Sequence, residues 1–346
     1  MYHERGDGLS SYLAGNDTLE QEGEGYSMIQ FLVKRFIGLI FVVIGVTFIT
    51  FILGYFAPGD PIRTLLGEHF DPVIYATLKH SYGLDLPWYQ QYFNFLTGLL
   101  RLDFGTSFHY QGRAVWDILS QGLPFSLELG FWALIIQFVI GVPLGIVSAL
   151  KANTWIDTTN MTIALALFSM PTFVIAVFFQ VIIVQLHVHG GLSWPVSNWG
   201  VPWHYTWTDI QFKLGPIVLL AATGFAYLTR LARNQMLEVL RQDYVRTARA
   251  KGLREHAVIY RHAFRNAMIP LVTVFGLSLG LLVAGVFFIE QVFNIPGVGQ
   301  VALVAISDRD YPVIQATTVL LAVGVVVGNL ISDLLYSVVD PRIKAA

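Results

Sequence analysis

Long stretches without a charged side chain constrain this sequence more than any other feature. The segment Phe36–Ala57 contains no Asp, Glu, Lys or Arg, and neither does Tyr311–Ser332. A helix of about 20 such residues is long enough to cross the hydrocarbon core of a bilayer. Overall, 55% of the 346 residues are hydrophobic and 13% are charged, roughly half the charged share of a soluble domain. The sequence therefore predicts an all-α, polytopic integral membrane protein.

Six segments of this kind predict six transmembrane helices. In the fourth, the uncharged part at 214–229 is short, and it reaches membrane length only with Arg230 or Arg233, whose long side chains can extend to the interface. The loop that follows the first helix is long, at 58–124, and we expect a cytoplasmic loop at 234–266. The predicted spans are approximately 36–57, 125–150, 158–186, 214–233, 267–289 and 313–338.

The basic residues predict the orientation. If the N-terminus is cytoplasmic, 15 of the 21 Lys and Arg residues lie in inner segments and six in outer ones, as the positive-inside rule requires. Both termini are then cytoplasmic. Residues 1–27 are polar and acidic and lack the apolar core of a signal peptide, so we expect a disordered tail before a membrane domain at 28–346.

The two longest predicted outer loops are rich in aromatic residues. In the first, the run from Trp88 to Leu96 is typical of a helix that lies on the membrane surface. The second, at 187–213, holds four Trp residues, which favour an aromatic belt at the interface over a platform for a partner.

Several functional classes lack support in the sequence. There is no Cys and the net charge is −2, which excludes thiolate chemistry and gives no sign of nucleic-acid binding. His187 and His189 have no evident third ligand, which favours interfacial residues over a metal site. We expect no catalytic residue, no cofactor and no bound metal.

The basic segment Arg230–Arg265 is the most informative part of the chain. It carries nine Lys or Arg residues against three acids. Two apolar stripes at helical spacing flank Gly252, which predicts two short amphipathic helices joined at that glycine. The stripes are Leu237, Leu240, Tyr244 and Ala248, then Leu253, Ala257, Tyr260 and Phe264. From periodicity alone, this knob either docks in a partner's groove or rests near anionic lipid.

The amino-acid sequence of this segment favours docking in a partner over contact with lipid, because it resembles a known family. Tyr244-Val-Arg-Thr-Ala-Arg-Ala-Lys-Gly252-Leu, followed by His262-Ala-Phe-Arg265-Asn266-Ala-Met-Ile-Pro270, closely resembles the cytoplasmic EAA loop of ABC-importer permeases, in the version of the dipeptide/oligopeptide (nickel) subfamily. Other motifs in family order extend the resemblance from about residue 28 to the end. They are Ala57-Pro-Gly-Asp-Pro61, Gly83-Leu-Asp-Leu-Pro87, Leu102-Asp-Phe-Gly-Thr-Ser107, Glu290-Gln-Val-Phe-Asn-Ile-Pro-Gly-Val-Gly299, Arg309-Asp-Tyr-Pro312 and Asp340-Pro-Arg342.

The sequence departs from the family pattern at two places. The general motif begins Glu-Ala-Ala, where this chain has Arg246-Thr247-Ala248, as is usual in the peptide subfamily. Ala114 stands where a proline commonly precedes Val115.

The resemblance implies a membrane subunit of an ATP-driven importer in the inner membrane of a prokaryote. Its expected partners are a homologous second permease, two cytoplasmic ATPases and an external substrate-binding protein that delivers peptides. The chain has no G-x-x-x-x-G-K-[ST] phosphate loop, which fits ATP hydrolysis by another subunit. Oligosaccharide or nickel stays open as the cargo, because such systems share these motifs.

The resemblance also implies roles for individual residues. Tyr244 and Ala248 would supply the face of the coupling helix that is buried against the ATPase, and Gly252 would form a turn with positive φ. Pro270 would mark the chain's return into the fifth span. Arg246, Arg249 and Lys251 are expected to meet acids of the ATPase, and the remaining loop positions are His262, Arg265 and Asn266.

Polar residues inside the predicted spans are candidates for the transport pathway. Pro171 lies within the third span and predicts a kink. Ser169 and Thr172 beside it either line the pathway or satisfy the freed backbone, and Asn329 in the last span is a third candidate. Glu128 lies near the outer end of its span, where a structural role is at least as well supported as a functional one.

A dinucleotide-like glycine motif and a second class of transporter are the remaining alternatives in the sequence. The run Gly297-Val-Gly299-Gln-Val-Ala302 matches a dinucleotide fingerprint, but it follows a membrane span rather than a strand, which favours a tight turn. An ion-coupled secondary transporter is the alternative of another class. It predicts charges near mid-bilayer and internal repeats, and the sequence shows neither clearly.

Overall fold

The structure is a computed structural model that describes residues 28–339, except for 58, 68–69, 111, 192 and 283–285. Its described secondary structure is helical apart from one isolated antiparallel bridge between Thr106 and Ala114, which confirms the all-α class. The predicted disordered tail and the motif at 340–342 lie outside the described residues.

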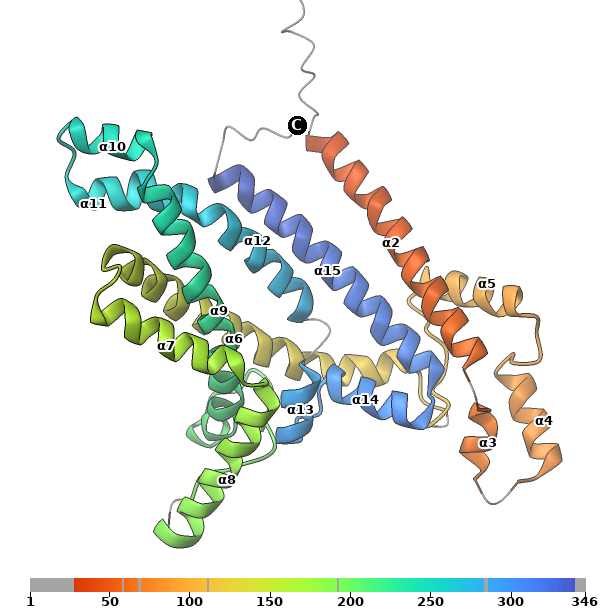
Figure 1. The fold of residues 1–346 in the computed structure, drawn as a ribbon. Helices are drawn as coiled ribbons and strands as arrows, with labels where there is room; N and C mark the ends of the chain where they lie inside the picture. The colour runs from red at the N-terminus through yellow and green to blue at the C-terminus, as the bar shows by residue number, and fades with distance from the viewer. Residues whose placement is uncertain are drawn as a thin grey trace, which may run out of the picture.

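The helices follow one another along the whole described chain (Figure 1). Their bounds are α2 (Met28–Phe56), α3 (Pro61–Leu66), α4 (Pro72–Ser81), α5 (Trp88–Leu99), α6 (Val115–Leu150), α7 (Trp155–Ser169), α8 (Thr172–Gly190), α9 (Trp207–Leu240), α10 (Asp243–Ala250), α11 (Glu255–Ala257), the π-helix η1 (Val258–Ala263), α12 (Phe264–Leu282), α13 (Phe287–Phe293), α14 (Val298–Asp308) and α15 (Tyr311–Val339).

Six helical segments are long and apolar enough to cross a membrane, as the sequence predicts. They are α2, α6, α8, α9, the run from α11 through α12, and α15. The start of α2, the end of α15 and the α10–α11 segment lie at one end of the molecule, which we call the elbow end (Figure 1). Helices α3–α5 and α13–α14 lie toward the opposite end.

The third predicted span is two helices rather than one kinked helix. Helix α7 ends at Ser169, Met170 is extended with φ −99° and ψ 132°, and α8 begins at Thr172. The ring of Pro171 disfavours a helical conformation at the residue before it, so the helix stops instead of bending. The Ser169 hydroxyl donates 2.6 Å to the backbone oxygen of Leu165, and α8 alone is long enough to span.

The fifth predicted span also ends earlier than expected. Helix α12 stops at Leu282, and residues 287–289 belong to α13, which meets α14 at a bend of 90°. The buried Glu290 carboxylate accepts hydrogen bonds from the backbone N–H groups of Val286, at 3.1 Å, and Gln300, at 2.9 Å. One acid therefore satisfies donors at the starts of both short helices.

The glycine motif beside this acid is the start of a helix and not the predicted turn, because Val298 and the residues after it belong to α14 and Gly297 is the N-cap. Gly297 precedes the first residue of α14, and a β-carbon at Gly297 or Gly299 would collide with the Glu290 side chain. Ser126 of α6 donates 2.7 Å to Glu290 and accepts 2.8 Å from the N–H of Val298. The glycines thus admit a buried carboxylate, not a dinucleotide.

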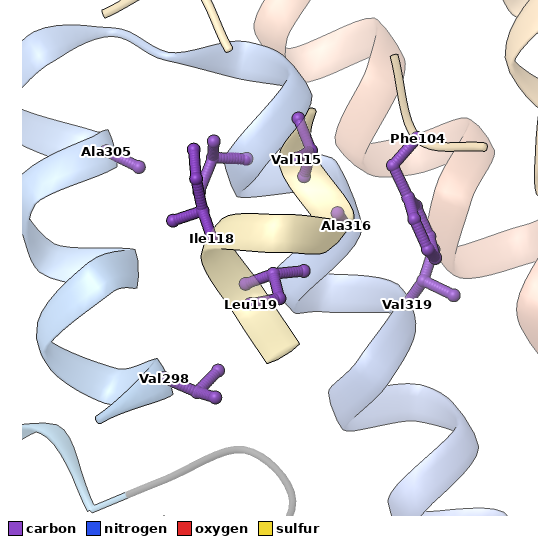
Figure 2. Close-up of a cluster of buried hydrophobic side chains, with 9 residues drawn as sticks. Phe104, Val115, Ile118, Leu119, Val298, Ala305, Ala316 and Val319 are labelled. Atoms are coloured by element: carbon purple, nitrogen blue, oxygen red, sulfur yellow. The ribbon is translucent and has the colours of Figure 1, made fainter. Parts of the chain in front are cut away.

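Close helix packing forms the centre of the bundle. Helix α6 packs along α9, and a β-carbon at Gly145 would lie 2.5 Å from the backbone oxygen of Thr229. Glycine at this position lets the two backbones approach. Arg35 of α2 pairs with Asp333 of α15. At the opposite end, buried apolar side chains of α6, α14, α15 and the loop before α6 pack together (Figure 2). They are Phe104, Val115, Ile118, Leu119, Val298, Ala305, Val313, Ala316 and Val319.

Some helices extend beyond the predicted bounds. Helix α6 begins ten residues earlier than the predicted span at 125, because Val115, Ile118 and Leu119 of its first turns are buried in the cluster with α14 and α15. Helix α9 begins at Trp207, where Thr206 and Asp209 form a capping box. The predicted loop at 58–124 contains α3, α4 and the start of α6, and the expected helix near Trp88 is α5.

A buried ion pair anchors the Trp-rich loop. The ammonium of Lys213 lies 2.8 Å from the carboxylate of Glu128, and both side chains are almost fully buried, at 3% and 0% exposed. The indole N–H of Trp199 and the backbone N–H of Trp203 each donate to Glu128 at 2.8 Å. This geometry supports the structural interpretation of Glu128, which joins the loop to α6 and α9.

We expect Glu128→Leu to destabilise the protein by about 3–5 kcal/mol, because it leaves the Lys213 ammonium buried without its partner. Thermal unfolding of the purified protein measures this. Glu238→Leu, at an exposed acid on α9, is the control and should change stability by about 0.5 kcal/mol or less. Equal stability of Glu128→Leu and the unmutated protein would contradict the role of the pair.

Candidate functional site

The basic segment forms a compact projection that we call the elbow, residues 243–263 (Figure 1). Gly252 has φ +75°, its N–H donates 2.9 Å to the oxygen of Arg249, and the N–H of Leu253 donates 3.4 Å to that of Ala248. These two bonds are those of a Schellman motif, which ends a helix with a left-handed residue. The predicted glycine turn with positive φ is confirmed.

The inner face of the elbow packs on the ends of two long helices. Val245 and Ala248 of α10 are buried together with Met236 of α9 and with Ile146 and Ala149 of α6. The same cluster continues through the π-helix into α12, with Val258, Ile259, Ala263 and Ala267. The elbow and the ends of α6, α9 and α12 therefore share one buried cluster, and close-packed interiors of this kind transmit strain.

The predicted apolar stripes are partly wrong. Ala248 is buried against its own chain and not available to a partner, whereas Tyr244, predicted on the same face, is 41% exposed. In the second stripe Leu253 and Tyr260 are exposed, and the buried residues are instead Val258 and Ile259. A π-helical turn at 258–263 changes the angle between successive side chains, so a period of 3.6 places the stripe on the wrong face.

The outer face of the elbow presents aromatic and basic groups. Asn266 donates 2.6 Å to the hydroxyl of Tyr244, which links α10 to α12. Arg249 contacts Glu255 at 2.8 Å across the glycine turn, and Arg246 lies 3.3 Å from Asp243. Both pairs are largely exposed to solvent, so each contributes little to stability. Two of the three cations expected to meet a partner therefore already have an acid beside them in this chain.

The remaining predicted loop residues are spread over this region. Lys251, Arg265 and Asn266 are exposed, and His262 is half-buried. Pro270 lies inside α12, which begins at Phe264, so it does not mark the start of that helix.

A second connection at the elbow end was missed from the sequence. The guanidinium of Arg233 on α9 makes a bidentate contact with Asp157 of α7, at 2.6 and 2.7 Å, a strong and directional geometry. The backbone N–H of Asn153 also donates to Asp157 at 2.9 Å. This pair ties α7 to α9, whose end packs on the elbow. The position of Arg233 at the end of the fourth predicted span was the sequence signal that could have indicated an ion pair here.

The candidate pathway residues lie on separate helices. Ser169 is exposed at the end of α7, and Thr172 at the start of α8 donates 3.3 Å to Thr223 of α9. Asn329 is exposed on α15, which packs mainly on α12 and α2. Across the described part of the chain, no three His, Cys, Asp or Glu residues gather in a way that would hold a metal ion.

Comparison with known proteins supplies the family. Residues 141–345 match the model of the binding-protein-dependent transport system inner membrane component, and residues 28–130 match that of its N-terminal part. The chain belongs to this family. It is the permease subunit of a binding-protein-dependent ABC importer and a multi-pass protein of the bacterial inner membrane, as the resemblance of its motifs implies.

Relatives align with this permease over nearly their whole length. The dipeptide transport system permease protein DppB of Alkalihalophilus pseudofirmus is 38% identical, over 92% of this chain and 100% of its own. DppB of Escherichia coli strain K12 is 36% identical over 92% and 99%. The oligopeptide transport system permease protein AppB of Bacillus subtilis is 37% identical over 92% and 100%.

Proposed function

We propose that this permease carries short peptides into the cell. Its cargo would come from an external binding protein, and its partners would be a homologous second permease and two ATPase subunits. The names of the relatives support the cargo, because they describe permeases for dipeptides, oligopeptides and glutathione. The family supports a binding protein and an ATPase as partners.

The proposed orientation places the elbow and both termini in the cytoplasm. The start of α2, the end of α15 and the elbow share one end of the molecule (Figure 1). That end carries most of the Lys and Arg residues, in line with the positive-inside rule.

The two-sided elbow is the observation that carries the proposed mechanism. Its outer face would sit in a groove of the ATPase, while its inner face is packed on α6, α9 and α12. Closure of the ATPase dimer on ATP would then shift these helices together and exchange an inward-open for an outward-open pathway. Such coupling needs two discrete arrangements whose balance the nucleotide changes.

The structure refines the proposed roles in the elbow. Tyr244, positioned by Asn266, would be the main contact with the ATPase, and Arg246 and Lys251 would lie at the rim of that contact, where charge affects association rate and specificity more than affinity. Ala248 would instead join α10 to the permease itself. Arg249 and Gly252 would hold the turn, with His262 and Arg265 beside it.

We also propose that Ser169, Thr172 and Asn329 contribute polar groups to the transport pathway. Their positions support this proposal. The first two flank the break between α7 and α8, and Asn329 is exposed on a helix that is otherwise mostly apolar.

We expect Tyr244→Arg to weaken the association of this permease with its ATPase by about 2 kcal/mol or more, about 30-fold, as for a central aromatic contact. Gly252→Pro should have the same effect by another route, because proline cannot adopt φ +75° or donate the N–H bond. Co-purification of the ATPase with the membrane-inserted permease measures both.

Trp155→Arg is the matched control, since Trp155 is a 76% exposed aromatic residue at the elbow end but outside the elbow. It should leave association unchanged. A Tyr244→Arg importer that assembled and transported normally would contradict docking at this face.

Mass spectrometry of cargo bound to the intact purified importer tests the peptide assignment. We expect short peptides, and we expect unlabelled dipeptides to compete with the uptake of a labelled dipeptide in vesicles. Oligosaccharides or a nickel chelate in their place would overturn the cargo while leaving the permease assignment intact.

A further inference from the structure

Helices α7 and α9 present aromatic rings and one cation together, close to the break between α7 and α8. The Phe168 ring, near the end of α7, stacks on the Tyr227 ring of α9 with centroids 6.3 Å apart. The guanidinium of Arg230 on α9 lies 5.4 Å from the centre of the same Phe168 ring. Phe168 is 50% exposed, Tyr227 is 42% exposed and Arg230 is half-buried. We call these three residues the Arg230 cluster.

The Arg230 side chain points away from the elbow. Positions 230 and 233 of α9 are about 4.5 Å apart along the helix axis, whereas positions 157 and 168 of α7 are about 16 Å apart. Arg233 contacts Asp157, at the start of α7, but Arg230 contacts Phe168, near its end. Side chains of a helix lean toward its N-terminus, and α9 runs toward the elbow, so its N-terminus lies away from it. Arg230 therefore extends toward the middle of the span, not toward the nearer interface as its position in the sequence suggests.

The helix break places the Arg230 cluster at membrane depth. Thr172, the first residue of α8, donates 3.3 Å to the hydroxyl of Thr223 on α9. Residue 223 is near the middle of the predicted span at 214–233, and Tyr227 is one helical turn from it. An arginine at this depth is costly in lipid, and such residues face a water-filled path or a partner.

Arg230 has no acid to pair with in the surrounding helices. It makes no hydrogen bond or ion pair with any described residue. Asp157 is the only acid of α7 and α8, and it already accepts from the Arg233 guanidinium and a backbone N–H. Helix α9 carries no Asp or Glu between 210 and 237. The Tyr227 hydroxyl also has no hydrogen-bond partner in the described part of the chain. The cluster thus offers a guanidinium and a phenol hydroxyl to a ligand from outside this chain.

We propose that Arg230 and Tyr227 bind the C-terminal carboxylate of the transported peptide as it passes the break between α7 and α8. A guanidinium matches a carboxylate with two parallel N–H bonds, and a phenol hydroxyl can donate a third. Every unmodified peptide carries this carboxylate whatever its side chains, so the contact suits a permease for varied short peptides. The inference rests on the proposed peptide cargo and on the proposed pathway role of Ser169 and Thr172, which flank the same break.

Other ligands suit this position less well. A nickel ion would be repelled by the unpaired guanidinium, and a neutral oligosaccharide carries no charge to pair with it. A lipid phosphate lies at the membrane interface, from which the Arg230 side chain points away. Lys151, exposed at the end of α6, is the kind of residue that meets such a phosphate.

Uptake of two dipeptides by the complete importer in vesicles tests this contact. Dialanine has the free carboxylate, and dialanine amide lacks it. We expect Arg230→Gln to reduce dialanine uptake about tenfold, because it loses a charge-assisted contact, and to leave uptake of dialanine amide unchanged. The external binding protein is the same for both importers, so its own preference cancels in the comparison. Arg230→Lys keeps the charge and should restore most of the dialanine uptake, and Tyr227→Phe should cause a smaller loss than Arg230→Gln.

Arg241→Gln is the matched control, because it removes an exposed cation at the end of the same helix. It should leave the uptake of both dipeptides unchanged. Heat stability of the permease–ATPase assembly without the binding protein gives a second measurement that does not depend on delivery. Dialanine should protect the unmutated assembly and the Arg241→Gln assembly, but not the Arg230→Gln assembly.

The outcomes separate this contact from its alternatives. An equal loss of uptake for both dipeptides in Arg230→Gln would point to a structural contact, or to an acid of the second permease, and would overturn the proposal. Normal dialanine uptake by Arg230→Gln would overturn it too, while leaving peptide transport intact. If dialanine amide is not taken up at all, the heat measurement decides, and protection of Arg230→Gln by dialanine contradicts the proposal. An unmutated importer that took up neither dipeptide would instead contradict the peptide cargo.

Discussion

The contact between small and aliphatic side chains beneath the elbow is the interaction on which the rest of this permease depends. Val245 and Ala248 are buried in one cluster with Met236 and Ile146, and the loss of such buried contacts costs several kcal/mol. Tyr244 and the basic residues face away from that contact. The elbow is therefore attached to the helix ends on one side and available to a partner on the other.

The opposite end of the molecule is organised by buried acids instead. Glu128 holds the Trp-rich loop on α6 and α9, and Glu290 holds α13 and α14 at their right-angled bend. Asp310 accepts from the backbone N–H groups of Phe108 and His109, at 3.1 and 3.2 Å, and so fixes the loop before α6 to the start of α15. Each acid keeps an irregular segment in place, where regular backbone hydrogen bonds are lacking. At the opposite end these hydrogen-bonded acids therefore stand beside an apolar cluster, whereas the elbow itself is held to the helix ends mainly by apolar packing.

The sequence predicts those features that depend on composition or on a single backbone requirement. Six apolar stretches predict the number of spans, and Gly252 predicts the left-handed turn of the elbow. The break after α12 was not predictable in this way, because Phe287–Ile289 is as apolar as the helix before it. The capping box of Thr206 and Asp209 was a readable signal for the true start of α9.

Other features depend on contacts between distant parts of the chain. Glu128 and Lys213 lie 85 residues apart, and nothing local to either residue identifies the other as its partner. The same holds for Asp157 and Arg233, 76 residues apart. The π-helical turn at 258–263 is not visible in the 3.6-residue pattern of the sequence, and within it Tyr260 is exposed against the predicted stripe.

The most direct test of the central claim is a pair of spin-label distances in the assembled importer. The permease contains no cysteine, so Lys151→Cys at the end of α6 and Ala250→Cys on the elbow can be labelled selectively. A rigidly attached elbow predicts that the distance between these labels is the same without nucleotide and with bound ATP, while the distance from residue 151 to the second permease changes. A label distance between 151 and 250 that changed with ATP while the helix ends stayed fixed would contradict it.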